Sequence, residues 1–140
     1  MNTGPDQVDR AGRTKLHYVA TDLPVEERVA TIRRLVAEGY DVNVRDSQGF
    51  TPLHFAVQSH DADAAATLIE LGAEIDPQDA FGNSPLWRAC MESRGRGELI
   101  QLLLRAGADP DLPNRNGKSP RDVASVIANY DVIRWFDPPE

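Results

Sequence analysis

Residues 46–56 read Asp-Ser-Gln-Gly-Phe-Thr-Pro-Leu-His-Phe-Ala. The same frame, in which Asp or Asn is followed three positions later by Gly and five positions later by Thr or Ser, begins again at Asp9, Asp79 and Asn114. Successive hydroxyl residues are 37, 33 and 35 positions apart, at Thr14, Thr51, Ser84 and Ser119. Self-similarity at such a period is the signature of a repeat array. The chain therefore contains four copies of one structural unit.

Each copy predicts a tight turn followed by a helix. Asp or Asn and then Gly suit the turn, because an Asp side chain bonds its own backbone and Gly accepts a positive φ. The hydroxyl residue, followed in three copies by proline, suits the N-cap and first turn of a helix. A second run with apolar residues three and four apart then closes on Gly39, Gly72 or Gly107, which are typical of a left-handed C-cap. Each unit is predicted to be turn, helix, helix.

The tetrapeptide Thr51-Pro52-Leu53-His54 within this frame resembles the ankyrin repeat, and the resemblance covers residues 9–136. It implies an all-α solenoid of about four helix-turn-helix units with short turn fingers. Stability must then come from stacking each unit on its neighbours. We expect one domain over residues 1–140, with units at about 9–45, 46–78, 79–113 and 114–140.

The end units depart from the frame in the way expected of caps. The first has Lys15 in place of proline, and the last has Asp122 in place of His. The chain finishes with large residues before prolines that stop a helix. We expect these residues to seal the exposed end of the core: Ile127, Tyr130, Ile133, Trp135 and Phe136.

Composition favours a cytoplasmic protein. No apolar run is long enough to span a bilayer, and the first residues lack the basic and apolar regions of a signal peptide. The one cysteine, Cys90, cannot form an internal disulfide, which fits a reducing compartment. The net charge of −7 argues against binding the nucleic-acid backbone. We expect neither nucleic acid nor membrane as a partner, and a monomer when free.

A search for catalytic and metal-binding residues finds no set. None of His17, His54 and His60 has a second His or Cys at ligand spacing, so no zinc site is expected. In ankyrin repeats the imidazole at the position of His17 and His54 hydrogen-bonds locally and to the neighbouring unit. Cys90 is expected to be a small buried apolar residue. We expect no catalytic residue, no metal and no cofactor.

Two further motifs have structural interpretations. Asp61-x-Asp63 and Asp109-x-Asp111 lack the glycine and closing glutamate of an EF-hand, and they fit helix caps and turns better. The stretch 94–97, Arg-Gly-Arg-Gly, lacks the Gly-Lys-Ser/Thr ending of a P-loop. It is interpreted as a two-residue insertion between the helices of the third unit.

The resemblance also implies a binding surface, because partners of ankyrin arrays usually dock on the fingers and the exposed positions of the first helices. Carried over position by position, it gives Arg10, Arg13, Arg45, Ser47, Gln48, Phe50, Gln58, Ser59, Gln78, Ala80, Phe81, Asn83, Met91, Glu92, Arg115, Asn116 and Lys118. Phe50 and Phe81 are expected to be exposed and flanked by arginines, which is the composition of interface hot spots. Packing against the adjacent finger is the alternative for both. Trp87 replaces the usual His and is either packing or a partner anchor.

The charge pattern leaves two types of partner open. Cations occupy finger positions, whereas many carboxylates lie on the second helices and the turns after them. An acidic peptide could dock on the fingers, or a basic partner on the opposite side.

Three functional hypotheses follow. The first is a protein that binds one protein partner, including an immunity protein that neutralises a cognate toxin. The third and fourth units, from Gly82 to Asp131, resemble a bacterial type of ankyrin protein, among which are immunity proteins encoded beside secreted toxins. The second is a general scaffold or regulatory adaptor. The third is an enzyme, for which the sequence offers no chemical constellation.

Overall fold

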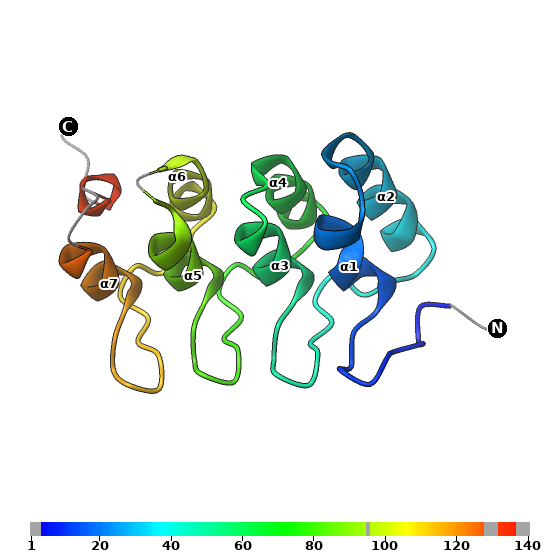
Figure 1. The fold of residues 1–140 in the computed structure, drawn as a ribbon, viewed down its shortest axis with the longest axis horizontal. Helices are drawn as coiled ribbons and strands as arrows, with labels where there is room; N and C mark the ends of the chain where they lie inside the picture. Colours follow the sequence, from blue (N-terminus) through cyan, green and yellow to red (C-terminus); the bar gives the residue numbers. More distant parts are fainter. Residues whose placement is uncertain (1–3, 95, 128–131, 137–140) are drawn as a thin grey trace.

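The computed structural model describes residues 4–94, 96–127 and 132–136, which form seven α-helices and one 3-10 helix (Figure 1). They contain no β-strand, so the predicted all-α architecture is confirmed. The elements are α1 (Lys15–Asp22), α2 (Val25–Ala37), α3 (Pro52–Gln58), α4 (Ala62–Glu70), α5 (Pro85–Glu92), α6 (Glu98–Arg105), α7 (Pro120–Val126) and η1 (Ile133–Trp135).

The first helix of every unit begins directly after the predicted hydroxyl residue. The side-chain oxygens of Thr14, Thr51, Ser84 and Ser119 each accept a backbone N–H of the first turn, at 3.1 to 3.4 Å. In units 1, 2 and 4 the side chain three residues after the cap (His17, His54 or Asp122) accepts the backbone N–H of the cap residue. In unit 4 this residue is Asp122, whose Oδ2 accepts from the Ser119 N–H at 2.9 Å. These reciprocal bonds satisfy N–H groups that a helix start leaves free.

The second helices end as predicted. Gly39, Gly72 and Gly107 follow α2, α4 and α6 with φ of 103°, 105° and 101°. A residue with a side chain is strained in this left-handed region, whereas glycine is not. Three residues separate α3 from α4 and five separate α5 from α6, which agrees with the predicted two-residue insertion in unit 3.

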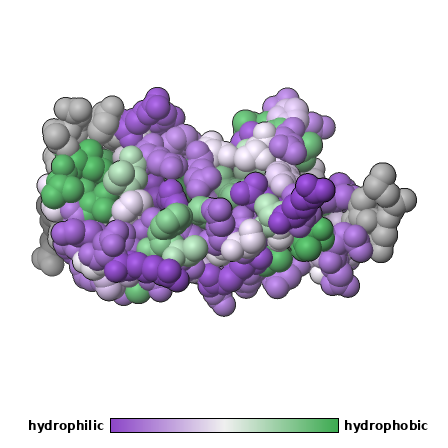
Figure 2. All heavy atoms as spheres, turned by 60° about the horizontal axis from the view of Figure 1, so that its bottom comes forward, coloured by the Kyte–Doolittle hydropathy of each residue, from purple (hydrophilic) through white to green (hydrophobic). Residues whose placement is uncertain are grey.

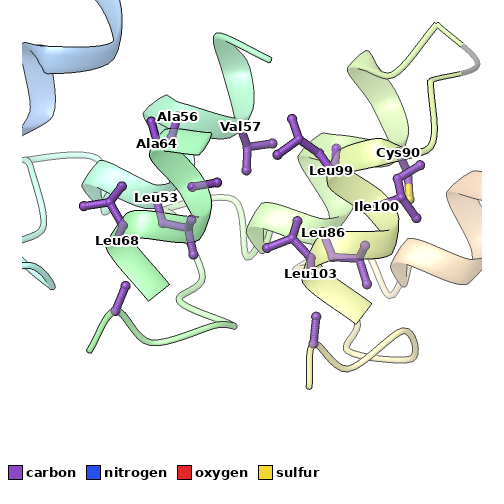
Figure 3. Close-up of a cluster of buried hydrophobic side chains, with 14 of the residues drawn as sticks. Leu53, Ala56, Val57, Ala64, Leu68, Leu86, Cys90, Leu99, Ile100 and Leu103 are labelled. Atoms are coloured by element: carbon purple, nitrogen blue, oxygen red, sulfur yellow. The ribbon is translucent and has the colours of Figure 1, made fainter. Parts of the chain in front are cut away.

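The units lie side by side, with the first helices in one row, the second helices in another, and the fingers along one edge (Figure 1). Each first helix packs on the next, and α2, α4 and α6 do the same. The core lies between the two rows, where Leu53, Leu86 and Leu103 have no exposed surface (Figure 3). Neighbouring units therefore bury the apolar face that one helix pair alone would leave in water.

The fourth unit differs from the others. Within the described part of this unit, α7 is followed by the short η1 and by no second α-helix. Phe136 is buried in the core cluster, and Ile127, Ile133 and Trp135 pack against that cluster, as expected of a cap. Tyr130, for which the same role was predicted, lies outside the described residues.

Candidate protein-binding face

Four fingers form one edge of the array, and we define them as residues 9–13, 45–50, 78–83 and 113–118. Each finger is closed by a hydrogen bond from the N–H of its Asp or Asn to the carbonyl four residues later. One backbone bond joins each finger to the next: Ser47 N–H to Ala11 O at 2.7 Å, Ala80 N–H to Gln48 O at 2.8 Å, and Arg115 N–H to Phe81 O at 3.0 Å. The fingers are therefore one connected layer rather than four independent loops.

Glycine is required where one finger approaches the next. Gly82 has φ of 81°, and a Cβ placed there would lie 2.7 Å from the backbone nitrogen of Arg115. Gly117 has a similar φ of 76° in the last finger, but nothing lies within 4 Å of its Cβ position. The turn conformation explains the glycine in every finger, and the inter-finger contact adds a second reason wherever another finger follows.

Two histidines tie neighbouring units together. His54 Nδ1 accepts from the Thr51 N–H at 3.1 Å, and Nε2 therefore donates to the carbonyl of Asn83 in the next unit at 3.1 Å. His17 makes the same pair of bonds, with Nε2 2.9 Å from the carbonyl of Phe50. Burial lowers the pKa of His54 to about 4, so the ring is neutral at pH 7. These bonds confirm the structural role implied by the resemblance.

Trp87 stands where the third unit would have this histidine. Its indole packs against the core cluster, and Nε1 is buried with no hydrogen-bond partner among the described residues. A donor that neither solvent nor a neighbouring acceptor reaches is poorly placed to contact a partner. Of the two alternatives for Trp87, the structure favours packing.

Aromatic rings and guanidinium groups from units 1–3 form a stack in which two neighbouring Phe rings have an arginine at each end. The guanidinium carbon of Arg13 is 4.9 Å from the ring centre of Phe55, and that of Arg88 is 5.2 Å from the ring centre of Phe50. The two Phe ring centres are 6.1 Å apart. Each arginine also bonds a finger carboxylate, with Arg13 Nε 3.0 Å from Asp46 Oδ2. Rings and carboxylates together hold both guanidinium groups in fixed positions.

Sequence reasoning missed Phe55 and Arg88, although a signal for them exists. Both follow directly after the position of the bridging histidine, and Tyr18 occupies the same register in unit 1. Tyr18 lies under Arg13, whose guanidinium carbon is 5.8 Å from the ring centre. One aromatic or guanidinium group at the same repeat position in three units points to a continuous stack.

The prediction that Phe50 is exposed is wrong. Its side chain is 8 % exposed because the ring packs edge-on against His54, with centres 5.5 Å apart, and lies under Arg88. Asn83 is also buried, and its Oδ1 accepts from Asn114 Nδ2 at 2.9 Å. Both residues therefore pack within the array. The alternative for Phe50 was packing against the adjacent finger, whereas its ring contacts residues of α3 and α5.

The other predicted residues reach the surface to different degrees. Phe81 is 59 % exposed and Met91 is 53 % exposed. The remaining exposed members of the predicted set are Arg10, Arg45, Ser47, Gln48, Ala80, Arg115, Asn116 and Lys118. The half-buried members are Arg13, Gln58, Ser59, Gln78, Trp87 and Glu92. We call the fingers together with Gln58, Met91 and Glu92 the finger face.

Hydrophilic residues cover most of the surface when the finger edge is turned forward, and apolar residues form separate patches (Figure 2). Phe81 is exposed, and the neighbouring fingers contain the exposed cations Arg45, Arg115 and Lys118. Single exposed apolar residues are ordinary, whereas an aromatic at a fingertip with cations on neighbouring fingers has the composition of a hot spot.

The described residues include no group of three or more His, Cys, Asp and Glu side chains placed to hold a metal ion. Burial raises the pKa of the Cys90 thiol to about 12, which keeps it protonated and unreactive at pH 7. A hollow of about 470 Å³ between α1 and α2 is lined by apolar residues together with the charged residues Lys15, Asp22, Glu27 and Arg34, and its lining contains neither His nor Cys.

No helix within the described ranges combines the length and apolar character that crossing a membrane would require.

Comparisons with known proteins agree with this architecture. The chain is similar to three animal proteins: ankyrin repeat and SOCS box protein 16 of Mus musculus, 38 % identical over 131 residues; ankyrin repeat domain-containing protein 63 of Homo sapiens, 33 % identical over 134 residues; and the B-cell lymphoma 3 protein homolog of Mus musculus, 33 % identical over 131 residues. These matches cover 87 %, 91 % and 93 % of this chain but only 27 %, 34 % and 29 % of the relatives.

The chain therefore spans about a third or less of the length of these relatives. A model of three consecutive ankyrin repeats matches residues 1–79, and a model of one ankyrin repeat matches residues 81–115. Ankyrin repeats are protein–protein interaction modules, and the chain belongs to the ankyrin repeat family.

Proposed function

We propose that the chain binds one protein partner through the finger face and performs no catalysis itself. The observation that carries this proposal is the 59 % exposed ring of Phe81 at the tip of the third finger. The backbone carbonyl of Phe81 accepts the inter-finger bond from Arg115, and its side chain is not a member of the core cluster of the described residues. A large apolar side chain that the fold does not use is suited to fill a pocket in a partner.

The rigidity of the face supports the same proposal. Fingers are linked to one another by backbone bonds, and units are linked by His17 and His54. Binding a partner to a surface that is already ordered costs less conformational entropy than ordering a loop. We also propose a cytoplasmic location and a single domain over residues 1–140.

Two finer hypotheses remain within this function. In the first, the partner is a toxin that the chain inhibits by covering its active surface. In the second, the chain is a scaffold or regulatory adaptor with no toxin. The animal relatives reported above lend no support to a bacterial immunity role, whose basis is the resemblance of units 3 and 4 to bacterial ankyrin proteins.

The test is capture followed by titration. The tagged chain is used to capture partners from its source cell, and the captured protein is identified and then titrated by calorimetry. We expect Phe81→Ala to weaken binding by about 1–4 kcal/mol. The matched control is Val25→Ala, because Val25 is 60 % exposed on α2, away from the fingers. Binding that depends on Val25 and not on Phe81 would contradict the proposal.

The same captured protein separates the two finer hypotheses. Its activity is measured with and without the chain. Loss of activity on binding supports inhibition of a toxin, whereas unchanged activity supports a scaffold or adaptor.

A further inference from the structure

The three carboxylates on the fingers are satisfied within the fold. In Asp9, Asp46 and Asp79, Oδ1 accepts the backbone N–H groups of the residues two and four positions later, at 2.8 to 3.0 Å. The second oxygen of each is also occupied. Its donors are the Tyr18 hydroxyl for Asp9, Arg13 for Asp46 and Arg88 for Asp79. The finger carboxylates therefore have little capacity left for a cationic partner.

The finger cations differ in this respect. Arg10, Arg115 and Lys118 are exposed, and their side chains make no hydrogen bond or ion pair with other residues of the described ranges. Arg45 is exposed as well and donates from Nη1 to the carbonyl of Gln78 at 2.8 Å. A carbonyl leaves the charge of a guanidinium uncompensated. The charge that the fingers present to solvent is thus mainly positive.

The rest of the molecule has the opposite charge. The fingers contain five cations and three carboxylates, whereas the whole chain has a net charge of −7, so the remaining residues have a net charge of −9. Such a distribution attracts an acidic surface toward the finger edge and repels it from the remaining surface. A basic surface would be steered away from the fingers.

We propose that the partner segment that docks on the fingers is acidic and contains one large apolar side chain. This inference rests on the proposed function, because it specifies the partner at the same site. Phe81, on the third finger, lies between the second finger with Arg45 and the fourth finger with Arg115 and Lys118. Carboxylates on either side of an apolar anchor would meet these cations while the anchor contacts the Phe81 ring.

The experiment uses a synthetic probe, so it needs no identified partner. The ¹⁵N-labelled chain is titrated with a short peptide of aspartate and glutamate around one leucine, at low and high salt. A second peptide has lysine in place of every acid. We expect amide shifts at the fingers with the acidic peptide, weaker binding at high salt, and no finger shifts with the lysine peptide. No finger shifts with the acidic peptide, or equal shifts with both, would overturn the inference.

Charge-reversal variants make the test specific. The double variant Arg115→Glu and Lys118→Glu is expected to bind the acidic peptide at least about tenfold more weakly. Arg105→Glu is the matched control, because Arg105 is an exposed arginine on α6, outside the fingers. Equal loss in both variants, or none in the double variant, would refute an acidic docking site.

The inference of an acidic partner and the proposed function can be tested separately. A captured partner that loses affinity with Phe81→Ala but contacts the fingers through a basic or neutral segment would sustain the proposed function and refute this inference.

Discussion

Asp76 occupies a position where the preceding unit uses asparagine, and we expect Asp76→Asn to stabilise the fold. In that preceding unit, Asn43 bonds the backbone of the next unit twice. Its Oδ1 accepts from the Glu74 N–H at 2.8 Å, and its Nδ2 donates to the Gly72 carbonyl at 3.3 Å. Asp76 lies 33 residues later and repeats only half of the pattern. Its Oδ2 accepts from the Asp109 N–H at 3.0 Å, while Oδ1 is buried with no partner.

A carboxylate cannot donate the second bond, whereas an amide can. By the same register, the acceptor available to Asn at position 76 is the carbonyl of Gly107, which is the counterpart of Gly72. A neutral hydrogen bond contributes about 1 kcal/mol, and removing an unsatisfied buried oxygen contributes about as much again. We therefore expect Asp76→Asn to raise the free energy of unfolding by about 1–2 kcal/mol, which corresponds to about 4–8 °C in Tm.

The stability gained by Asp76→Asn depends on pH, and the pKa of Asp76 sets the direction of that dependence. Burial, with the nearby Asp109 charge as a smaller cause, raises the pKa of Asp76 above its ordinary 3.8. The native state therefore binds a proton more tightly than the unfolded state, and wild-type stability falls as pH rises from about 4 through the raised pKa. The advantage of the Asn variant should grow over that interval and shrink below it, where protonated Asp76 can also donate.

Reversible urea or thermal unfolding, followed by circular dichroism from acid to neutral pH, measures both effects. The reciprocal variant Asn43→Asp is the control, and it should lose about 1–2 kcal/mol by creating the same unsatisfied oxygen in the first contact. If Asp76→Asn is no more stable than wild type at pH 7, or if the difference does not change with pH, the proposed equivalence of the two contacts is incorrect.

The remaining predictions concern finger residues and the buried histidine His54. Phe50→Ala should lower the free energy of unfolding by about 3 kcal/mol, since the ring is buried, whereas Phe81→Ala should change it by less than about 0.5 kcal/mol. Equal losses in urea unfolding would contradict the assignment of Phe50 as buried and Phe81 as exposed. Gly117→Ala should cost about 1 kcal/mol through its positive φ, and Gly82→Ala should cost more, because its Cβ also meets the next finger. The pKa of His54 is lowered to about 4, so the contribution of His54 to stability is complete above about pH 6.5 and is lost as pH falls through 4. The stability of a His54→Gln variant should therefore depend less on pH over this interval. An unchanged pH profile would refute a neutral buried imidazole.

The repeat frame by itself determined the architecture. Hydroxyl residues such as Thr51 and Ser119 predict helix starts because a backbone N–H needs an acceptor there, and Gly72 predicts a helix end because only glycine takes a left-handed conformation without strain. These requirements involve residues within a few positions of one another. Local sequence therefore fixes the helices, the fingers and their order, and a period near 33 residues fixes their stacking.

The tertiary structure decided which finger residues a partner can reach. Phe50 and Phe81 both lie on fingers, and their local sequences gave no reason to treat them differently. Their exposures differ because Arg88, from the next unit, lies over the ring of Phe50, whereas Phe81 remains 59 % exposed. Likewise, Asp46 becomes a buried partner of Arg13 only when the first two units stack, 33 residues apart in sequence. Exposure and pairing depend on side chains that arrive from neighbouring units, and packing between units is what brings them together.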